Sequence, residues 1–291
     1  MNILCDIENS LEEIELYGWA KVFVSCGHDF LFLDRSQKAI LDAFEEKKPD
    51  IFITHINALN RATKKAIERN DYCKSVVIIN QNEDKQKLEN KKNIFFISQN
   101  NLDCLKVEPS CDIFLCIKPK TELSMISDFC YVGDYVKENI FSKFFSKFRV
   151  KCWGKTLWPY ANYLGNIKNE KIKNIIYSST LSFFSDDLKN KNWPLYCYMC
   201  NKAVINYKSD WLKSILINND TYFSNEEEMF NEIFKILRDE QKLAKNIKCN
   251  HEHVKNNHLS HHRVSDILNY IGFSEESKRC LNAVMEMMKK Y

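Results

Sequence analysis

The stretch "PDIFITHINALNRATKKAIERNDYCKSVVIIN", residues 49–80, contains the repeating unit of the fold. One apolar run covers residues 49–55, and a second covers residues 74–80. Between them, the apolar residues of the segment 60–70 recur every three to four positions, as they do in an amphipathic helix. Two apolar strands joined by a helix are typical of a parallel crossover. The segment therefore predicts a parallel β-sheet with helices packed on it.

The same alternation continues toward both ends of the first half of the chain. Ser10, followed three residues later by Glu13, is typical of a helix start. Further strands are predicted at 2–6, 29–34, 93–98 and 112–118, and further helices at 10–28, 36–47 and 83–90. This order predicts a doubly wound, Rossmann-like α/β lobe over residues 1–125.

The second half repeats the pattern. Strands are predicted at 128–134, 149–154, 181–185 and 202–206, and helices at 138–148, 170–180, 195–201, 225–257, 260–270 and 274–291. We therefore expect a second Rossmann-like lobe over residues 126–275 and a cleft between the two lobes. The last helical segment, 276–291, can pack back on the first lobe.

Composition agrees with a globular chain of this size. The protein has 291 residues, of which 45% are hydrophobic and 28% are charged. That length suits two domains, and the apolar content suffices for two cores. No apolar run approaches the roughly 20 residues that span a bilayer, and the first ten residues lack the pattern of a signal peptide. We therefore expect no transmembrane segment and a cytoplasmic location.

The cysteines indicate the redox state of the protein, and the distribution of charge indicates where an anionic ligand can bind. The twelve cysteines are scattered through apolar segments, which favours reduced core thiols over a disulfide framework. The net charge is only +3, but residues 1–128 contain 17 Lys/Arg and 21 Asp/Glu, against 25 and 18 in the remainder. The second half is therefore the better place for an anionic ligand.

Glycines mark the ends of predicted strands in the second half. Gly133 and Gly154 each end a strand, and Gly165 precedes a predicted helix. Such positions can present unpaired main-chain amides to a phosphate. The stretch "CWGKTLWPYANYLG", residues 152–165, also contains two tryptophans, which are either part of a ligand-facing edge or core aromatics. Because no GxGxxG or P-loop motif is present, the type of nucleotide stays open.

Six ordered segments of the second half carry a family resemblance. They are "YVGD", "VKCWGKTLWP", "YLGNIKNEKIKNIIYSSTLSF", "YCYMCNKAVI", "YFSNEEEMFNEIFKILRDEQ" and "HHRVSDIL". Over residues 129–270 this order resembles the donor-binding domain of GT-B glycosyltransferases, nearest to the spore-maturation-protein type. In the first half, "GHDFLFLD" and "KPDIFITH" resemble strands of GT-B N-terminal domains only in pattern.

The resemblance implies transfer of a sugar from a nucleotide diphosphate sugar to a glycan or other acceptor, without a metal or another cofactor. The positions that it implies for contact with the donor are Gly133, Lys137, Gly154, Lys155, Gly165, Asn166, Ile167, Ser182 and Ser185. The family's ribose-binding glutamate falls on Cys197, and a thiol cannot replace a carboxylate as acceptor from two hydroxyls. Either Asp186 or Asp187 then binds the ribose, or donor binding is weak or lost.

Two residues of the first lobe are candidates for the catalytic base. His55 follows the third predicted strand and Asp6 ends the first, so both face the expected cleft. His55 can equally be a structural histidine at a strand end. The histidines of 249–263 and the "CYMC" motif raise the question of zinc, but their helical spacing argues against it, and we expect no metal site. No RNA-binding signature is present, and we expect no nucleic-acid partner.

Three functions compete at this point. The first is an active glycosyltransferase, and the second is a non-catalytic relative of the same fold that binds a sugar or a partner. The third is an unrelated two-lobed nucleotide-binding protein. The sequence leaves the donor sugar, the nucleobase, the acceptor and the stereochemical outcome open.

Overall fold

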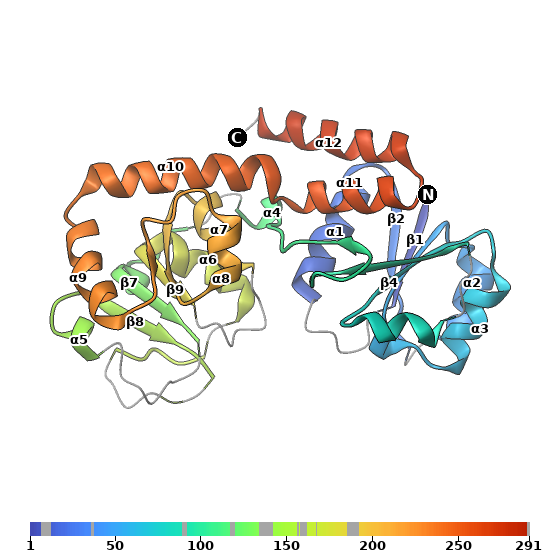
Figure 1. The fold of residues 1–291 in the computed structure, drawn as a ribbon, viewed down its shortest axis with the longest axis horizontal. Helices are drawn as coiled ribbons and strands as arrows, with labels where there is room; N and C mark the ends of the chain where they lie inside the picture. The colour runs from blue at the N-terminus through green and yellow to red at the C-terminus, as the bar shows by residue number, and fades with distance from the viewer. Residues whose placement is uncertain are drawn as a thin grey trace. The chain divides into compact units, whose positions relative to one another are not determined.

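The chain forms two compact units. The computed structural model describes residues 1–6, 13–35, 38–88, 92–116, 120–133, 142–155, 157, 162–166, 168–184 and 192–289. The first unit comprises Met1–Pro109 together with Ser260–Tyr291, and the second comprises Ser110–Leu259. Both divisions, after Pro109 and after Leu259, lie earlier in the chain than the expected ones after residues 125 and 275. The two C-terminal helices, α11 (Ser260–Tyr270) and α12 (Ser274–Met288), both belong to the first unit (Figure 1).

The first unit is a doubly wound α/β domain. Its sheet has the order β2-β1-β3-β4-β5-β6, and every described strand pair is parallel. The strands are β1 (Asn2–Asp6), β2 (Asp29–Phe32), β3 (Ile51–His55), β4 (Lys74–Ile78), β5 (Ile94–Ser98) and β6 (Leu105–Lys106). The helices are α1 (Glu13–Ser25), α2 (Ile40–Lys47), α3 (Arg61–Arg69), α11 (Ser260–Tyr270) and α12 (Ser274–Met288), with 3-10 turns η1 (Ile56–Ala58) and η2 (Asn82–Lys87).

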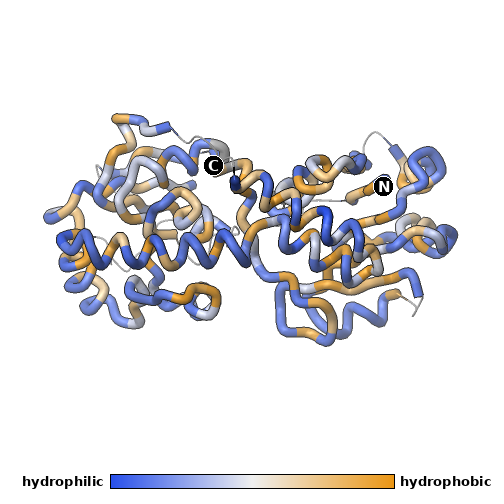
Figure 2. The backbone as a smooth tube through the Cα atoms, turned by 90° about the horizontal axis from the view of Figure 1, so that it is seen from above, coloured by the Kyte–Doolittle hydropathy of each residue, from blue (hydrophilic) through white to orange (hydrophobic). Residues whose placement is uncertain are grey.

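Helices cover both faces of this sheet. Successive side chains of a strand point to opposite faces, so Ile3 packs with α1 and α11 while Leu4 packs with α2 and α3. The α1 side is covered by the apolar residues of α1, α11 and α12 (Figure 1). This burial explains why the strands are apolar at nearly every position. The covering helices, by contrast, alternate between hydrophobic and hydrophilic segments (Figure 2).

The second unit has the same architecture. Its sheet has the order β11-β10-β9-β7-β8, again parallel throughout the described pairs. The strands are β7 (Ser127–Val132), β8 (Val150–Trp153), β9 (Ser179–Phe184), β10 (Ala203–Tyr207) and β11 (Tyr222–Phe223). The helices are α4 (Ile113–Cys116), α5 (Ser142–Phe145), α6 (Asn169–Ser178), α7 (Trp193–Met199), α8 (Asp210–Ile215), α9 (Glu226–Ile236) and α10 (Glu240–Asn257), with the 3-10 turn η3 (Leu123–Met125).

Three segments differ from their predicted structure. The run 112–118, predicted as a strand, contains the short helix α4, because a short apolar run does not distinguish a buried strand from a buried helix. The predicted helix 83–90 is the 3-10 turn η2. The predicted helix 225–257 is divided into α9 and α10, and Asp239 caps the second of them by accepting the Lys242 N–H.

Cysteine chemistry and membrane character follow directly from the fold. All twelve cysteines are free thiols, and most of them are buried in the two cores. None of the helices in the described ranges combines the length and the apolarity needed to cross a bilayer.

Candidate functional site

Each sheet has one point at which the chain reverses its direction of winding. In the second unit, the chain passes from β7 to β8 on one side and then to β9 on the other. In the first unit, it passes from β1 to β2 and then to β3. Ligands of open α/β sheets bind outside the carboxyl ends of the strands at such points. The carboxyl ends of β7 and β9, and those of β1 and β3, are therefore the first places to examine.

The predicted glycines of the second unit gather at its carboxyl edge. The Gly133 N–H donates to the Trp153 carbonyl at 2.9 Å, and the Gly154 N–H donates to the Gly165 carbonyl at 3.3 Å. Gly165 has φ +97°, a left-handed conformation that favours glycine. We expected unpaired amides here, and for Gly133 and Gly154 this was wrong, because both amides bind neighbouring carbonyls.

The segment from Asn162 to Gly165 runs beside β8. The Cys152 N–H donates to the Asn162 carbonyl, and the Leu164 N–H donates to the Cys152 carbonyl, both at 2.9 Å. The Tyr163 hydroxyl also donates to the Gly154 carbonyl at 2.9 Å. These bonds add an irregular edge to the sheet and fix the position of Gly165. Trp153 is buried beneath this edge, so it is a core aromatic.

Two polar residues of the prediction lie exposed along this edge. Lys155 directly follows Gly154, and Asn166 directly follows Gly165. The second unit contains 22 Lys/Arg and 17 Asp/Glu, against 20 and 22 in the first, so it is the more basic unit, as expected. Lys137, Ile167 and Ser185 lie outside the described residues, as do Asp186 and Asp187.

Ser182 and Cys197 belong to the core of the second unit. Ser182 is fully buried, and its hydroxyl accepts from the Cys130 thiol at 3.2 Å. It therefore does not fit the diphosphate contact that we expected. Cys197 is also fully buried, and desolvation holds the pKa of its thiol well above the usual range. The position at which we expected a ribose-binding group is thus occupied by a neutral thiol inside the core.

At the reversal point of the first unit, Asp6 is tied to a cation. Its side chain is fully buried. The Arg35 Nε donates to Asp6 Oδ1 at 2.8 Å, and Arg35 Nη2 also contacts Oδ2. Arg35 Nη2 further donates to the Ala58 carbonyl at 2.6 Å and to the Thr63 hydroxyl at 3.1 Å. This network joins β1 to η1 and α3, and it favours a structural role for Asp6 over the role of a base.

His55 is likewise engaged by the main chain. Its Nδ1 accepts the Asn57 N–H at 3.1 Å and so caps η1. In a neutral imidazole whose Nδ1 accepts a hydrogen bond, the proton resides on Nε2. The Nε2 atom is then a donor, and it cannot take a proton from an acceptor hydroxyl. This geometry favours the structural reading of His55.

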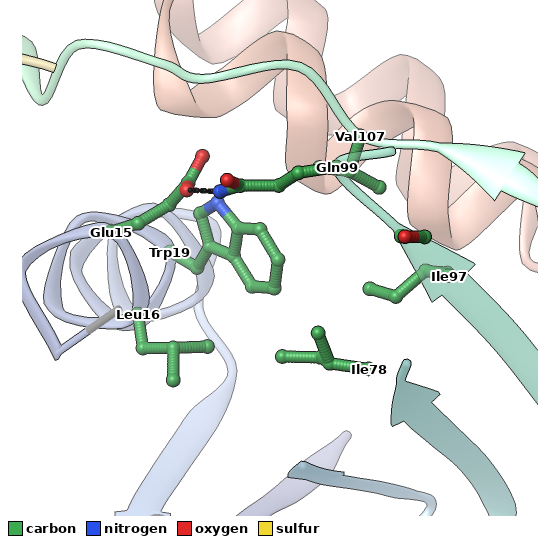
Figure 3. A pocket seen from close by; sticks show the side chains of 8 residues that line it. Glu15, Leu16, Trp19, Ile78, Ile97, Gln99 and Val107 are labelled. Carbon is green, nitrogen blue, oxygen red and sulfur yellow. Dashed lines mark hydrogen bonds between the residues drawn. The ribbon is translucent and has the colours of Figure 1, made fainter. Parts of the chain in front are cut away.

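A small pocket lies at the carboxyl edge of β4 and β5 (Figure 3). Its apolar walls are Leu16, Ile78, Ile97 and Val107, and its polar groups belong to Glu15, Trp19, Ser98 and Gln99. The free volume is about 10 Å³, which is enough for one water molecule or one hydroxyl group. The pocket therefore suits a single polar group of a ligand better than a whole sugar.

The polar groups of this pocket include a buried carboxylate. Glu15 is 6% exposed, and the Gln99 amide donates to its Oε2 at 2.8 Å (Figure 3). Trp19 is 3% exposed, and among the described residues its indole N–H finds no acceptor. A buried unpaired donor costs about 1–3 kcal/mol, so the indole N–H favours a bound oxygen. Because Glu15 is a charged residue near the start of an amphipathic helix, nothing in the sequence distinguished it as a site residue.

A second hollow of the first unit is basic. A groove of about 560 Å³ is lined by Leu59, Asn60, Arg61, Lys64, Lys65 and Glu68. These residues belong to α3 and to the segment that precedes it. Three cations and one carboxylate line the groove, so its charge suits an anionic group.

The histidines of the C-terminal part pair with one another and with the main chain. His253 Nε2 lies 3.3 Å from His258 Nε2, and His251 Nδ1 lies 2.8 Å from the Tyr198 carbonyl. Within the ranges that the structure describes, no three histidine, cysteine or acidic side chains are grouped so that they could hold a metal ion. The "CYMC" cysteines lie in and at the end of α7, on core positions.

His261 makes stability depend on pH. Burial, with a smaller effect of His262, lowers the pKa of His261 to about 4, against about 6.5 in an unfolded chain. The unfolded state therefore binds a proton that the folded state excludes. We expect full stability above pH 6.5 and a loss of about 1.4 kcal/mol per pH unit between pH 6.5 and 4. Urea unfolding at pH 7.0 and 5.5 measures this loss, and an unchanged pH slope in His261→Gln would contradict the assignment.

Comparisons with known proteins give structural matches only. The sequence matches no protein-family model and no curated protein. An alpha-glucosyltransferase solved with UDP and DNA containing an HMU base is 12% identical, with a TM-score of 0.63 over 93% of this chain and 99% of that chain. Anabaena HepE, solved with UDP and glucose, is 12% identical, with a TM-score of 0.61 over 92% and 98%. T4 phage BGT, solved with UDP and Mn²⁺, is 13% identical, with a TM-score of 0.52 over 98% and 99%.

These matches establish the fold. Two parallel-sheet α/β units in one chain, matched over more than nine-tenths of its length, are the GT-B architecture that the sequence predicts. No finding singles out the spore-maturation type as the nearest relative. The first of these solved structures contains DNA, so the expectation that nucleic acid is no partner has no support here.

Proposed function

We propose that this protein is a glycosyltransferase that moves a sugar from a nucleotide diphosphate sugar to an acceptor hydroxyl. The observation that carries the proposal is the edge of the second unit where Gly154 binds Gly165 and is followed by Lys155. This edge adjoins the reversal point of a basic α/β unit, where ligands of such sheets bind. The structural neighbours solved with UDP have the same two-unit fold.

On the donor side, we assign the diphosphate to Lys155 and to the main chain around Gly165 and Asn166. A lysine and main-chain amides can neutralise the charge that develops on the departing diphosphate. We retain the expectation that no metal is needed, although T4 phage BGT was solved with Mn²⁺. Activity that EDTA abolishes and Mn²⁺ restores would contradict that part of the proposal.

On the acceptor side, we assign the general base to Glu15. A carboxylate has two oxygens that can each accept more than one hydrogen bond, and the Gln99 amide donates to Oε2 of Glu15. The Trp19 N–H can donate to the oxygen of the acceptor while Glu15 takes the hydroxyl proton. His55 and Asp6 are less suitable as the base. His55 Nδ1 already accepts the Asn57 N–H, and both carboxylate oxygens of Asp6 are engaged by Arg35.

The acceptor that we expect from the sequence is a glycan or another acceptor with a free hydroxyl group. The basic groove on α3 favours DNA as a second candidate, because Arg61, Lys64 and Lys65 can bind backbone phosphates, and one structural neighbour was solved with DNA containing an HMU base. A neutral glycan makes no use of these cations. Transfer to DNA should therefore fall when Lys64 and Lys65 are both changed to Ala, and transfer to a neutral glycan should not.

Ligand-induced stabilisation tests the donor assignment. We expect one of UDP, GDP and TDP, or its sugar, to stabilise the protein by about 2.7 kcal/mol at 100 times its Kd. Lys155→Ala should weaken this binding at least ~10-fold, because it removes a charge-assisted contact. Thermal unfolding with a series of nucleotide concentrations measures both effects.

Lys245→Ala is the matched control, since Lys245 is an exposed lysine of α10 in the same unit. It should bind the nucleotide like the wild type. No stabilisation by any nucleotide would contradict the proposal. Stabilisation without transfer to glycan or DNA acceptors would favour the non-catalytic relative of the same fold.

A further inference from the structure

Two cysteines 254 positions apart meet inside the first unit. Cys26 follows the end of α1, Cys280 lies in α12, and their Sγ atoms are 3.2 Å apart. Both are free thiols and belong to the same apolar core. Cys280 is fully buried, whereas Cys26 is 8% exposed, so Cys26 is the more accessible residue of the pair.

The surroundings of Cys26 favour its thiolate. The Cys280 thiol lies within hydrogen-bond distance of it, the Ser25 hydroxyl lies 4.0 Å away, and Arg279 adds positive charge. Against the effects of burial and Glu276, these contacts lower the pKa of Cys26 to about 7. The same hydrogen bond raises the pKa of Cys280, which stays protonated. Cys26 is thus the nucleophile of the pair and Cys280 is the resolving thiol.

We propose that Cys26 and Cys280 are a redox site, which a hydroperoxide converts into a disulfide between the end of α1 and α12. The Cys26 thiolate attacks one peroxide oxygen, the O–O bond breaks, and hydroxide leaves with the electron pair, so that Cys26 becomes a sulfenic acid. The Cys280 sulfur then attacks the Cys26 sulfur. The S–O bond breaks, and the oxygen leaves as water with the Cys280 proton. The peroxide is reduced by two electrons and the two thiols are oxidised.

A second thiol pair provides the internal comparison. Cys111 Sγ and Cys116 Sγ lie 3.6 Å apart in the second unit. The pKa of each of these thiols is raised, by burial for Cys111 and by the bond from Cys111 for Cys116. The two thiols are close together in both pairs. Of these two pairs, the thiolate is favoured only in the pair of Cys26 and Cys280.

The disulfide would close a loop that contains most of the chain. It would join α12 covalently to α1, whose apolar residues it helps to bury. Cross-links that close long loops restrict the unfolded state most. Oxidation should therefore raise the melting temperature of the first unit, by about 5 °C or more. The site is independent of the proposed transferase activity.

The full-length protein is treated with hydrogen peroxide, alkylated and digested without reduction. We expect a peptide that joins Cys26 to Cys280, two fewer titratable thiols, and a rise in melting temperature that dithiothreitol reverses. This mapping needs no substitution, so a variant that fails to fold does not affect it. Cys26→Ser and Cys280→Ser should each lose the rise in melting temperature, and Cys111→Ser should keep it.

Three results would overturn the proposal. The first is peroxide oxidation of Cys26 to sulfinic acid without a cross-link, which would show that Cys280 does not resolve it. The second is alkylation of Cys26 at pH 7 no faster than that of Cys111. The third is a peroxide-dependent rise in melting temperature that persists in Cys280→Ser.

Discussion

Changing Glu15 to Gln is expected to lower the rate of sugar transfer at least ~100-fold while leaving nucleotide-sugar binding unchanged. A positioned general base typically contributes about 10²–10⁴ in rate. The amide of Gln keeps the size and much of the polarity of Glu15, but it cannot take a proton from a hydroxyl. Steady-state transfer assays measure kcat, and thermal shift measures donor binding.

Two variants of the same pocket separate catalysis from structure. Trp19→Phe removes a buried N–H that has no acceptor among the described residues, which offsets part of the cost of the cavity that the smaller ring leaves in the core. It should nevertheless raise KM for the acceptor if the N–H binds the acceptor oxygen. Glu275→Gln, on an exposed position of α12, is the control for loss of a carboxylate. A kcat of Glu15→Gln within twofold of the wild type would exclude Glu15 as the base.

Changing Arg35 to Met is expected to destabilise the first unit by about 3–5 kcal/mol. The substitution leaves the carboxylate of Asp6 buried without its cation, which costs more than the ion pair itself contributes. It also removes the donors to the Ala58 carbonyl and the Thr63 hydroxyl. Urea unfolding followed by circular dichroism measures the change in the free energy of unfolding.

The double variant Asp6→Ala with Arg35→Met tests the cause. If the buried charge produces the loss, the double variant should be more stable than Arg35→Met alone. Arg149→Met removes a comparable pair with Asp128 that lies exposed in the second unit, and it should leave unfolding almost unchanged. An equal loss for Arg35→Met and Arg149→Met would rule out burial as the reason.

Sequence patterns predicted the strands best where burial on both faces left no choice of residue. The runs that became β3, β4 and β5 are apolar because helices cover both sides of the sheet. The run that became α4 has similar letters, and only its tertiary surroundings make it helical. Local composition therefore predicts burial more reliably than it predicts the backbone conformation of a short segment.

The candidate site was predictable only in part. Gly154 and Gly165 stand out in a chain with six glycines, and the structure brings them together. The pocket around Glu15 combines residues from three segments, at 15–19, 78 and 97–107, whose proximity depends on the order of strands in the sheet. The predicted contact of Ser182 with the diphosphate does not fit its buried position, because alignment to a motif does not say which face of a strand a side chain occupies.

The division of the chain has a consequence for biosynthesis. Residues up to Pro109 emerge from the ribosome before the second unit, but Val264, Ile267 and Leu268, which cover the apolar side of α1, emerge after it. While the second unit is translated, Trp19 and Phe23 of the nascent first unit therefore lack the residues of α11 that cover them. A chain released before residue 260 would expose this surface to chaperones and proteases, whereas its central unit would already be contiguous and able to collapse.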